Sequence, residues 1–278
     1  MPAPQASMMQ QLARAKFMGF ALKVPTNWQQ PTGDAGKQYG DAFKEGESST
    51  APGSPPLVQP ASMNKYHTDT QKMHVAKIGA FLDGICSAIC SAWGQWQGLA
   101  TLTTVTITGP VAVGGMVVGP PWTPLIMASA PKASPQELKY SNAVANVLGT
   151  AWLSYTATIK VAGMPWYPLF AAMPSPVAPP TPNIPCPVMA LVQVPASLAP
   201  PVLKSQMQAA LADPMAPFHG QLFEAVADAF DKCFKIWQTS TMVTNVLGTG
   251  PVPTFAPPYV PVGPVIGGIG NMTPGGFV

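Results

Sequence analysis

The sequence predicts an α+β protein made of three quasi-repeated helix–strand–Pro/Gly units with long, extended Pro-rich arms. An apolar stretch at residues 81–111 recurs without a gap at residues 222–252, at a constant offset of 141 (222 − 81). In each copy, apolar residues spaced by three and four precede a β-branched run, which indicates a helix followed by a strand. The chain also contains 35 prolines, which limit regular structure between the units.

This organisation predicts an N-terminal arm over residues 1–70 and a repeat body over residues 71–278. The units of the body are expected at about residues 71–133, 134–201 and 202–278. The offset aligns Trp96 with Trp237, and a looser third copy places Gly163 where Gly109 stands. Aromatic side chains at helical spacing beside a strand are typical of a core. The expected core aromatics are Trp93, Trp96, Trp152, Tyr155, Phe234 and Trp237.

The expected N-terminal arm begins with a short amphipathic helix over residues 8–22. This helix would either bind a partner or a membrane surface, or dock on its own subunit. Residues 25–71 are rich in Pro, Gly, Ser, Thr and Gln, which is the composition of a linker.

The first repeat unit is expected to hold a helix over about residues 70–99 and a strand over residues 101–108. The strand is β-branched at nearly every position and ends at Gly109. Further on, Gly119, Pro120 and Pro121 argue against regular structure.

The second helix has a sharp start at Ser134, followed by Pro135 and Glu137, which is the pattern of a capping box. The proline-rich residues 165–201 then favour an extended chain that cannot form a central strand. A third helix is expected over about residues 217–241, and it keeps a charged outer face.

Charge is scarce and unevenly distributed. Asp, Glu, Lys and Arg make up 9% of the residues, against roughly 25% in typical soluble domains. None occurs in residues 84–131, 161–203 or 236–278. A free monomer is normally covered with charge, so these segments are expected to be covered by lipid or by protein.

Lipid is the less favoured cover, because Gly and Pro interrupt the apolar residues 111–130 and irregular backbone is not tolerated against lipid. Membrane contact is therefore not expected, whereas protein cover implies a large assembly. Buried interface cores exclude charge and favour aromatic residues and Met. The expected interface residues are Met116, Val118, Trp122, Met127 and Ile266.

The sequence contains no recognisable catalytic pattern. His67, His74 and His219 are far apart, and no nucleotide-binding or hydrolase motif is present. The four cysteines, Cys86, Cys90, Cys186 and Cys233, are expected to be small buried residues. We therefore expect a protein that is not an enzyme and binds no cofactor or metal. A net charge of +3 does not argue for nucleic acid.

Residues 81–126 resemble uncharacterised structural proteins encoded beside phage tails and contractile injection systems. The resemblance rests on the Trp/Thr helix and the following run GPVAVGGMVVGPPWTPLI. It implies a virion-like particle with a tail hub or spike as neighbour, and it carries over no functional residue.

The sequence thus predicts a structural subunit that plugs, caps or cements a larger assembly, such as a baseplate. Its partners would be other protein subunits, arranged around a threefold axis because the unit is repeated three times. No basic and apolar leader follows Met1, so synthesis in the cytoplasm without a signal peptide is expected. The alternative is a membrane-active effector or toxin that uses the long uncharged segments.

Overall fold

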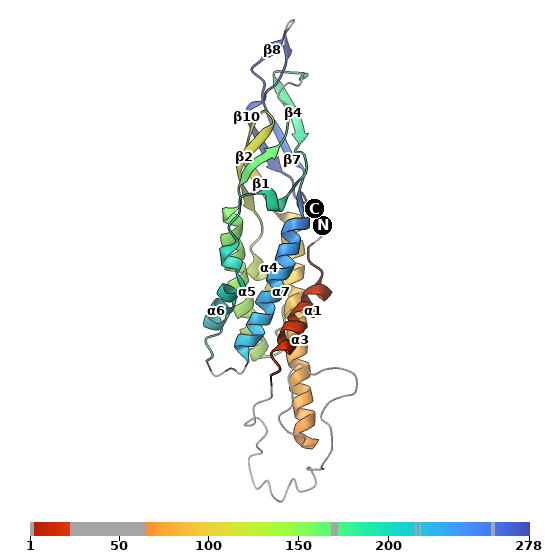
Figure 1. The fold of residues 1–278 in the computed structure, drawn as a ribbon, viewed down its shortest axis with the longest axis vertical. Coiled ribbons are helices and arrows are strands. Elements are labelled where there is room, and N and C mark those ends of the chain that lie inside the picture. Colours follow the sequence, from red (N-terminus) through yellow and green to blue (C-terminus); the bar gives the residue numbers. More distant parts are fainter. Residues whose placement is uncertain (1–2, 23–64, 168–171, 215, 217, 257–258) are drawn as a thin grey trace, which may run out of the picture.

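The computed structural model describes residues 3–22, 65–167, 172–214, 216, 218–256 and 259–278. The molecule is elongated, with its helices gathered in one half and its long strands in the other (Figure 1). It therefore has the predicted α+β class. We refer to these parts as the helix half and the sheet half.

The helix half is a closed ring. Going round it, each helix contacts the next in the order α1, α3, α4, α5, α6, α7 and back to α1. The long helices α3, α5 and α7 therefore alternate with the short helices α1, α4 and α6. The bounds are Ala6–Gly19 (α1), Lys65–Leu99 (α3), Trp122–Ser129 (α4), Pro135–Thr158 (α5), Pro200–Leu211 (α6) and His219–Ser240 (α7).

The three long helices lie close to their predicted positions. The capping box of α5 is present, with the Ser134 hydroxyl accepting from the Glu137 backbone N–H and the Glu137 carboxylate accepting from the Ser134 backbone N–H. For helix α1, at the start of the expected N-terminal arm, the structure agrees with the alternative that it docks on its own subunit. Its residues Met9, Ala13 and Phe17 are buried between α3 and α7, so α1 belongs to the body. The predicted linker lies mostly outside the described residues.

The sheet half is built on six antiparallel strands in the order β3–β2–β1–β10–β7–β4. Strand β1 matches the predicted strand, whereas β2 and β10 lie in segments where no strand was expected. The bounds are Thr101–Thr108 (β1), Val111–Val118 (β2), Val161–Pro165 (β3), Val177–Pro182 (β4), Val246–Pro251 (β7) and Ile266–Met272 (β10).

The sheet curls until its two edges meet. The backbone N–H of Ile184, just after β4, donates to the carbonyl of Pro165 at the end of β3 (3.2 Å). Glycines on the inner face leave room for the Trp166 indole. A Cβ atom on Gly248 would lie 2.6 Å from its Cζ2 atom, and one on Gly270 would lie 3.0 Å from Cη2. The curled sheet thus has a filled interior.

The proline-rich residues 165–201 are only partly extended. They contain the edge strand β4, the short strand β5 (Cys186–Pro187), two 3₁₀ turns and the start of α6. Proline lacks a backbone N–H, which suits an edge position. The remaining short strands are β6 (Met242–Val243), which pairs with β5, and the hairpin of β8 (Phe255–Ala256) with β9 (Val260–Pro261). That hairpin forms the far tip of the sheet half (Figure 1).

The core of the ring is aromatic. The rings of Trp93, Trp152 and Phe234, one from each long helix, form a triangle with centroids 5.1 to 6.3 Å apart. Trp96, Tyr155 and Trp237 stand one turn further along the same helices and are also buried. All six predicted core aromatics therefore lie inside the molecule.

Candidate functional site

The outer surface of the curled sheet is the candidate functional site. Its exposed apolar side chains range in exposure from 40% for Leu247 to 56% for Ile269. One row crosses four strands: Val113 faces Thr106, which faces Ile269, which faces Thr249. The six strands contain no Asp, Glu, Lys or Arg. We call this surface, on strands β1–β4, β7 and β10, the uncharged sheet surface.

Three of the five predicted interface residues lie on this surface. Met116, Val118 and Ile266 are each about half exposed. Trp122 is not an interface residue in this structure, because it is only 1% exposed and its ring stacks on Trp152 with centroids 4.0 Å apart. Met127, on α4, is partly buried against the core.

Trp122 is buried, contrary to the expectation from the sequence, for a local reason. Its uncharged, proline-rich surroundings favoured an irregular segment at an interface. Proline is tolerated in the first turn of a helix, where its missing N–H would have no partner. Pro124 occupies such a position in α4, so a short helix forms and turns Trp122 inward.

The tip of the sheet half carries exposed aromatics that the sequence did not reveal as such. Tyr259 is 87% exposed and Phe255 is also exposed. Tyr259 has a positive φ of 99°, which is unusual for a residue with a side chain. The tip therefore extends the uncharged sheet surface with aromatic side chains.

Among the described residues, charge is confined almost entirely to the helix half, where it forms ion pairs between helices. Glu224 on α7 binds Lys16 on α1 (3.0 Å) and Lys204 on α6 (2.7 Å). Arg14 on α1 binds Asp83 on α3. These pairs lie on the outside of the ring, where water solvates the charges.

The cysteines lie in the interior. All four are buried with free thiols, and Cys90 Sγ is 3.6 Å from Met9 Sδ. Burial raises the pKa of Cys233 to about 11 and that of Cys90 to about 12. The thiolate is the nucleophilic form, so both thiols are protonated and unreactive at neutral pH.

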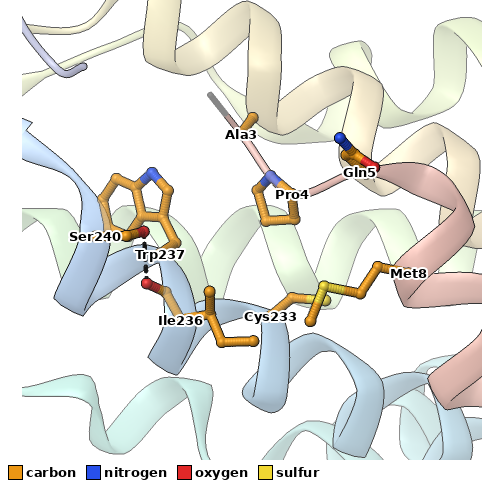
Figure 2. A pocket seen from close by; sticks show the side chains of 8 residues that line it. All are labelled: Ala3, Pro4, Gln5, Met8, Cys233, Ile236, Trp237 and Ser240. Carbon is orange, nitrogen blue, oxygen red and sulfur yellow. Dashed lines mark hydrogen bonds between the residues drawn. The ribbon is translucent and has the colours of Figure 1, made fainter. Parts of the chain in front are cut away.

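A cavity of about 320 Å³ lies between the start of α1 and the end of α7 (Figure 2). Cys233, Ile236 and Trp237 line one side of it, and Pro4 and Met8 line the other. Cys233 is the only titratable side chain among its lining residues, and its thiol is protonated. This cavity is suited to apolar packing rather than to acid–base chemistry.

The histidines are not placed together with the cysteines. His219 opens α7, with its Nε2 atom 3.3 Å from Gln208 Nε2. It shares a second cavity, of about 440 Å³, with His74, Lys77 and Tyr140. The side chain of His67 lies outside the described residues. Within the described part of the chain, no group of three His, Cys, Asp or Glu residues is arranged to hold a metal ion.

In the described part of the chain, one helical segment has the length and composition needed to cross a membrane. It is Ala76–Leu99 of α3, with a mean hydropathy of 1.2 over its most apolar window. In the fold, 56% of that window is buried. The central helix of a soluble bundle has the same properties, so the segment does not by itself indicate a membrane span.

Comparison with known proteins finds no matching family model, curated protein or solved structure.

Proposed function

We propose that this chain is a structural subunit that plugs, caps or cements a larger protein assembly through its uncharged sheet surface. The observation that carries the proposal is the contrast between that surface and the helix half. Half-exposed apolar side chains cover the strands, and burying apolar surface contributes about 25 cal/mol per Å². The core of a protein–protein interface likewise contains few charged residues.

The resemblance of residues 81–126 directs the proposal toward a particle of the phage-tail or contractile-injection kind. In that setting the neighbour would be a tail hub or spike. The elongated shape, with a narrow aromatic tip, suits a plug or cap at the end of such a structure (Figure 1).

We also propose that the body consists of three repeated units, and the helices support this. The long helices end at Leu99, Thr158 and Ser240. Five residues after each end stands a residue with positive φ. These residues are Thr104 (56°), Gly163 (148°) and Asn245 (54°). The equivalent of Gly163 is thus Thr104, not Gly109, which lies in the turn between β1 and β2.

The strand order supports the same repeat. Each unit has a first strand (β1, β3 or β7) and a last strand (β2, β4 or β10). Each first strand pairs with the last strand of another unit, as β1–β10, β3–β2 and β7–β4. A threefold arrangement requires such a cycle.

The proposed units run from a short helix to a last strand segment, over residues 6–118, 122–192 and 200–278. These bounds differ from those expected from the sequence. Helix α4 groups with α5 because α1 precedes α3 and α6 precedes α7 in the same order.

The test is to place a charge on the uncharged sheet surface. Val118→Asp and Ile266→Asp should prevent incorporation into the particle, because an unpaired charge buried in an interface costs several kcal/mol. Both variants should keep the helical circular dichroism of the parent, since both sites are exposed. Incorporation is measured by sedimenting the particle and blotting for the chain.

Two controls place the same residue on the helix half. Leu153 on α5 is 70% exposed, so Leu153→Asp matches the apolar-to-Asp change. Lys232 pairs with Asp228 on the outer face of α7, so Lys232→Asp tests a change of surface charge. Both should be incorporated. Normal incorporation of the two sheet variants, or loss confined to the controls, would contradict the proposal.

A membrane-active effector is the second candidate, and the apolar segment Ala76–Leu99 is the observation that favours it. That candidate requires α3 to leave the ring, which would expose Trp93 and Trp96. It predicts binding of the purified chain to phosphatidylcholine vesicles, whereas the structural role predicts none.

A further inference from the structure

Three half-exposed valines occupy matching places in the three units. Each valine pairs through the backbone with the second residue after the end of a long helix. The pairs are Thr101–Val118, Lys160–Val192 and Met242–Val278.

The environment of the three valines is also alike. Val118, Val192 and Val278 are 48%, 52% and 47% exposed. The residue before each is apolar and buried. These preceding residues are Val117, Leu191 and Phe277. Each valine is thus exposed next to a residue that is anchored in the core, and of the three only Val118 lies in a strand.

A second set repeats the pattern nearer the tip. Val113 faces Thr106, Asn271 faces Leu247, and the Ile184 N–H donates to Pro165. The members of this set are Val113, Ile184 and Asn271, which are exposed and uncharged. Exposed, uncharged side chains therefore recur around the circumference of the sheet rather than on one side of it, and two of the three in this set are apolar.

We infer that the partner presents three identical, uncharged apolar surfaces, contributed by three copies of one chain around the pseudo-threefold axis. One copy of this protein would bind three copies of the partner. The inference rests on the proposed structural role and adds the symmetry and number of the partners.

Three copies of one partner chain fit these surfaces better than a single partner chain does. A single chain would cover one unit and leave two similar apolar surfaces in water, where they promote aggregation. A closed ring of three copies covers all of them with one kind of contact. The charge pattern agrees, because Lys160 is the only charged residue in the three pairs and its Nζ lies 3.3 Å from the carbonyl oxygen of Gly115.

The test uses a photo-crosslinking residue, p-benzoylphenylalanine, at position 118, 192 or 278 of the full chain in the cells that make it. Crosslinked peptides are identified by mass spectrometry. Position 153 on α5 is the control, because Leu153 is exposed on the helix half.

All three positions should crosslink to the same peptide of the same partner, and position 153 should not. Native mass spectrometry of the released complex should give a ratio of one to three. Crosslinks to different proteins or peptides, or at one position only, would overturn the threefold inference while leaving the structural role standing. No crosslink from any of the three positions would overturn both.

Discussion

The two halves of the molecule differ in the side chains that cover their cores. The helix half buries an aromatic core and covers it with ion pairs such as Lys204–Glu224. The sheet half buries Trp166 between glycines but covers itself with Val, Ile, Thr and Pro. The helix half is suited to contact with water, and the sheet half exposes apolar side chains, as the proposed protein interface requires.

Under the proposed role, this difference also separates the residues that stabilise the fold from those that contact a partner. Substitutions inside the ring are expected to unfold the chain, whereas substitutions on the uncharged sheet surface should leave it folded and unassembled. The following predictions test this division, beginning with the largest effect on the free energy of unfolding.

Trp152→Ala should be the most destabilising of these changes. The Trp152 ring stacks on Trp122 at 4.0 Å and meets Trp96 edge-on at 4.9 Å, so truncation leaves a large cavity. The expected loss is about 3–5 kcal/mol. The neighbouring Leu153→Ala is a matched control and should change stability by no more than about 0.5 kcal/mol, because its side chain is exposed. Guanidinium chloride unfolding measures both, and equal losses would contradict an aromatic core centred on Trp152.

Gly248→Ala should have an intermediate effect and acts on the interior of the sheet half. The added methyl group would lie 2.3 Å from Ile107 Cδ1 and 2.6 Å from Trp166 Cζ2. Overpacking of this kind costs about 1–3 kcal/mol.

The matched control is Gly98→Ala in α3, where an added methyl group meets nothing within 4 Å. It should be neutral or stabilise by up to about 1 kcal/mol, because alanine favours helix. Thermal unfolding distinguishes the two. A neutral Gly248→Ala would mean that Trp166 does not fill the curled sheet.

The elements that could be predicted from the sequence are those with a clear local pattern. The long helices α3, α5 and α7 and strand β1 have clear apolar periodicity or β-branched runs, so their predicted positions were close to those observed. Helices α4 and α6 were not predicted. Strands β2 and β10 contain Gly114 and Gly115, and Gly267, Gly268 and Gly270. Glycine has low strand propensity, and these strands depend on partners far away in the sequence.

The uncharged character of the candidate site could be predicted from the sequence, but not all of its residues. The absence of charge located the uncharged segments, and Met116, Val118 and Ile266 were found in this way. The exposure of Val192 and Val278 depends on pairing with Lys160 and Met242, which no local pattern reveals. Burial of Trp122 likewise depends on contact with Trp152 on another helix.

The smallest effect is expected from the ion pairs of the helix half. Glu224→Gln should cost no more than about 1 kcal/mol, because partly exposed ion pairs contribute little. Hydrogen bonds from Lys204 and then Lys16 lower the pKa of the Glu224 carboxyl below its ordinary value. A carboxyl whose pKa is lower in the folded state stabilises the fold above the unfolded-state pKa, which is about 4.3 for Glu.

That contribution should disappear as the pH falls through the lowered pKa of Glu224. The parent should therefore lose more stability than Glu224→Gln between pH 6 and acidic pH, as measured by urea unfolding. Asp231→Asn is the control, because the Asp231–Lys235 pair lies within one helix and joins no neighbours. If Asp231→Asn changed the pH dependence of stability more than Glu224→Gln, the ion pairs between helices would not be what stabilises the ring. In that case, the scarcity of ion pairs in the sheet half would not lower the stability of the fold.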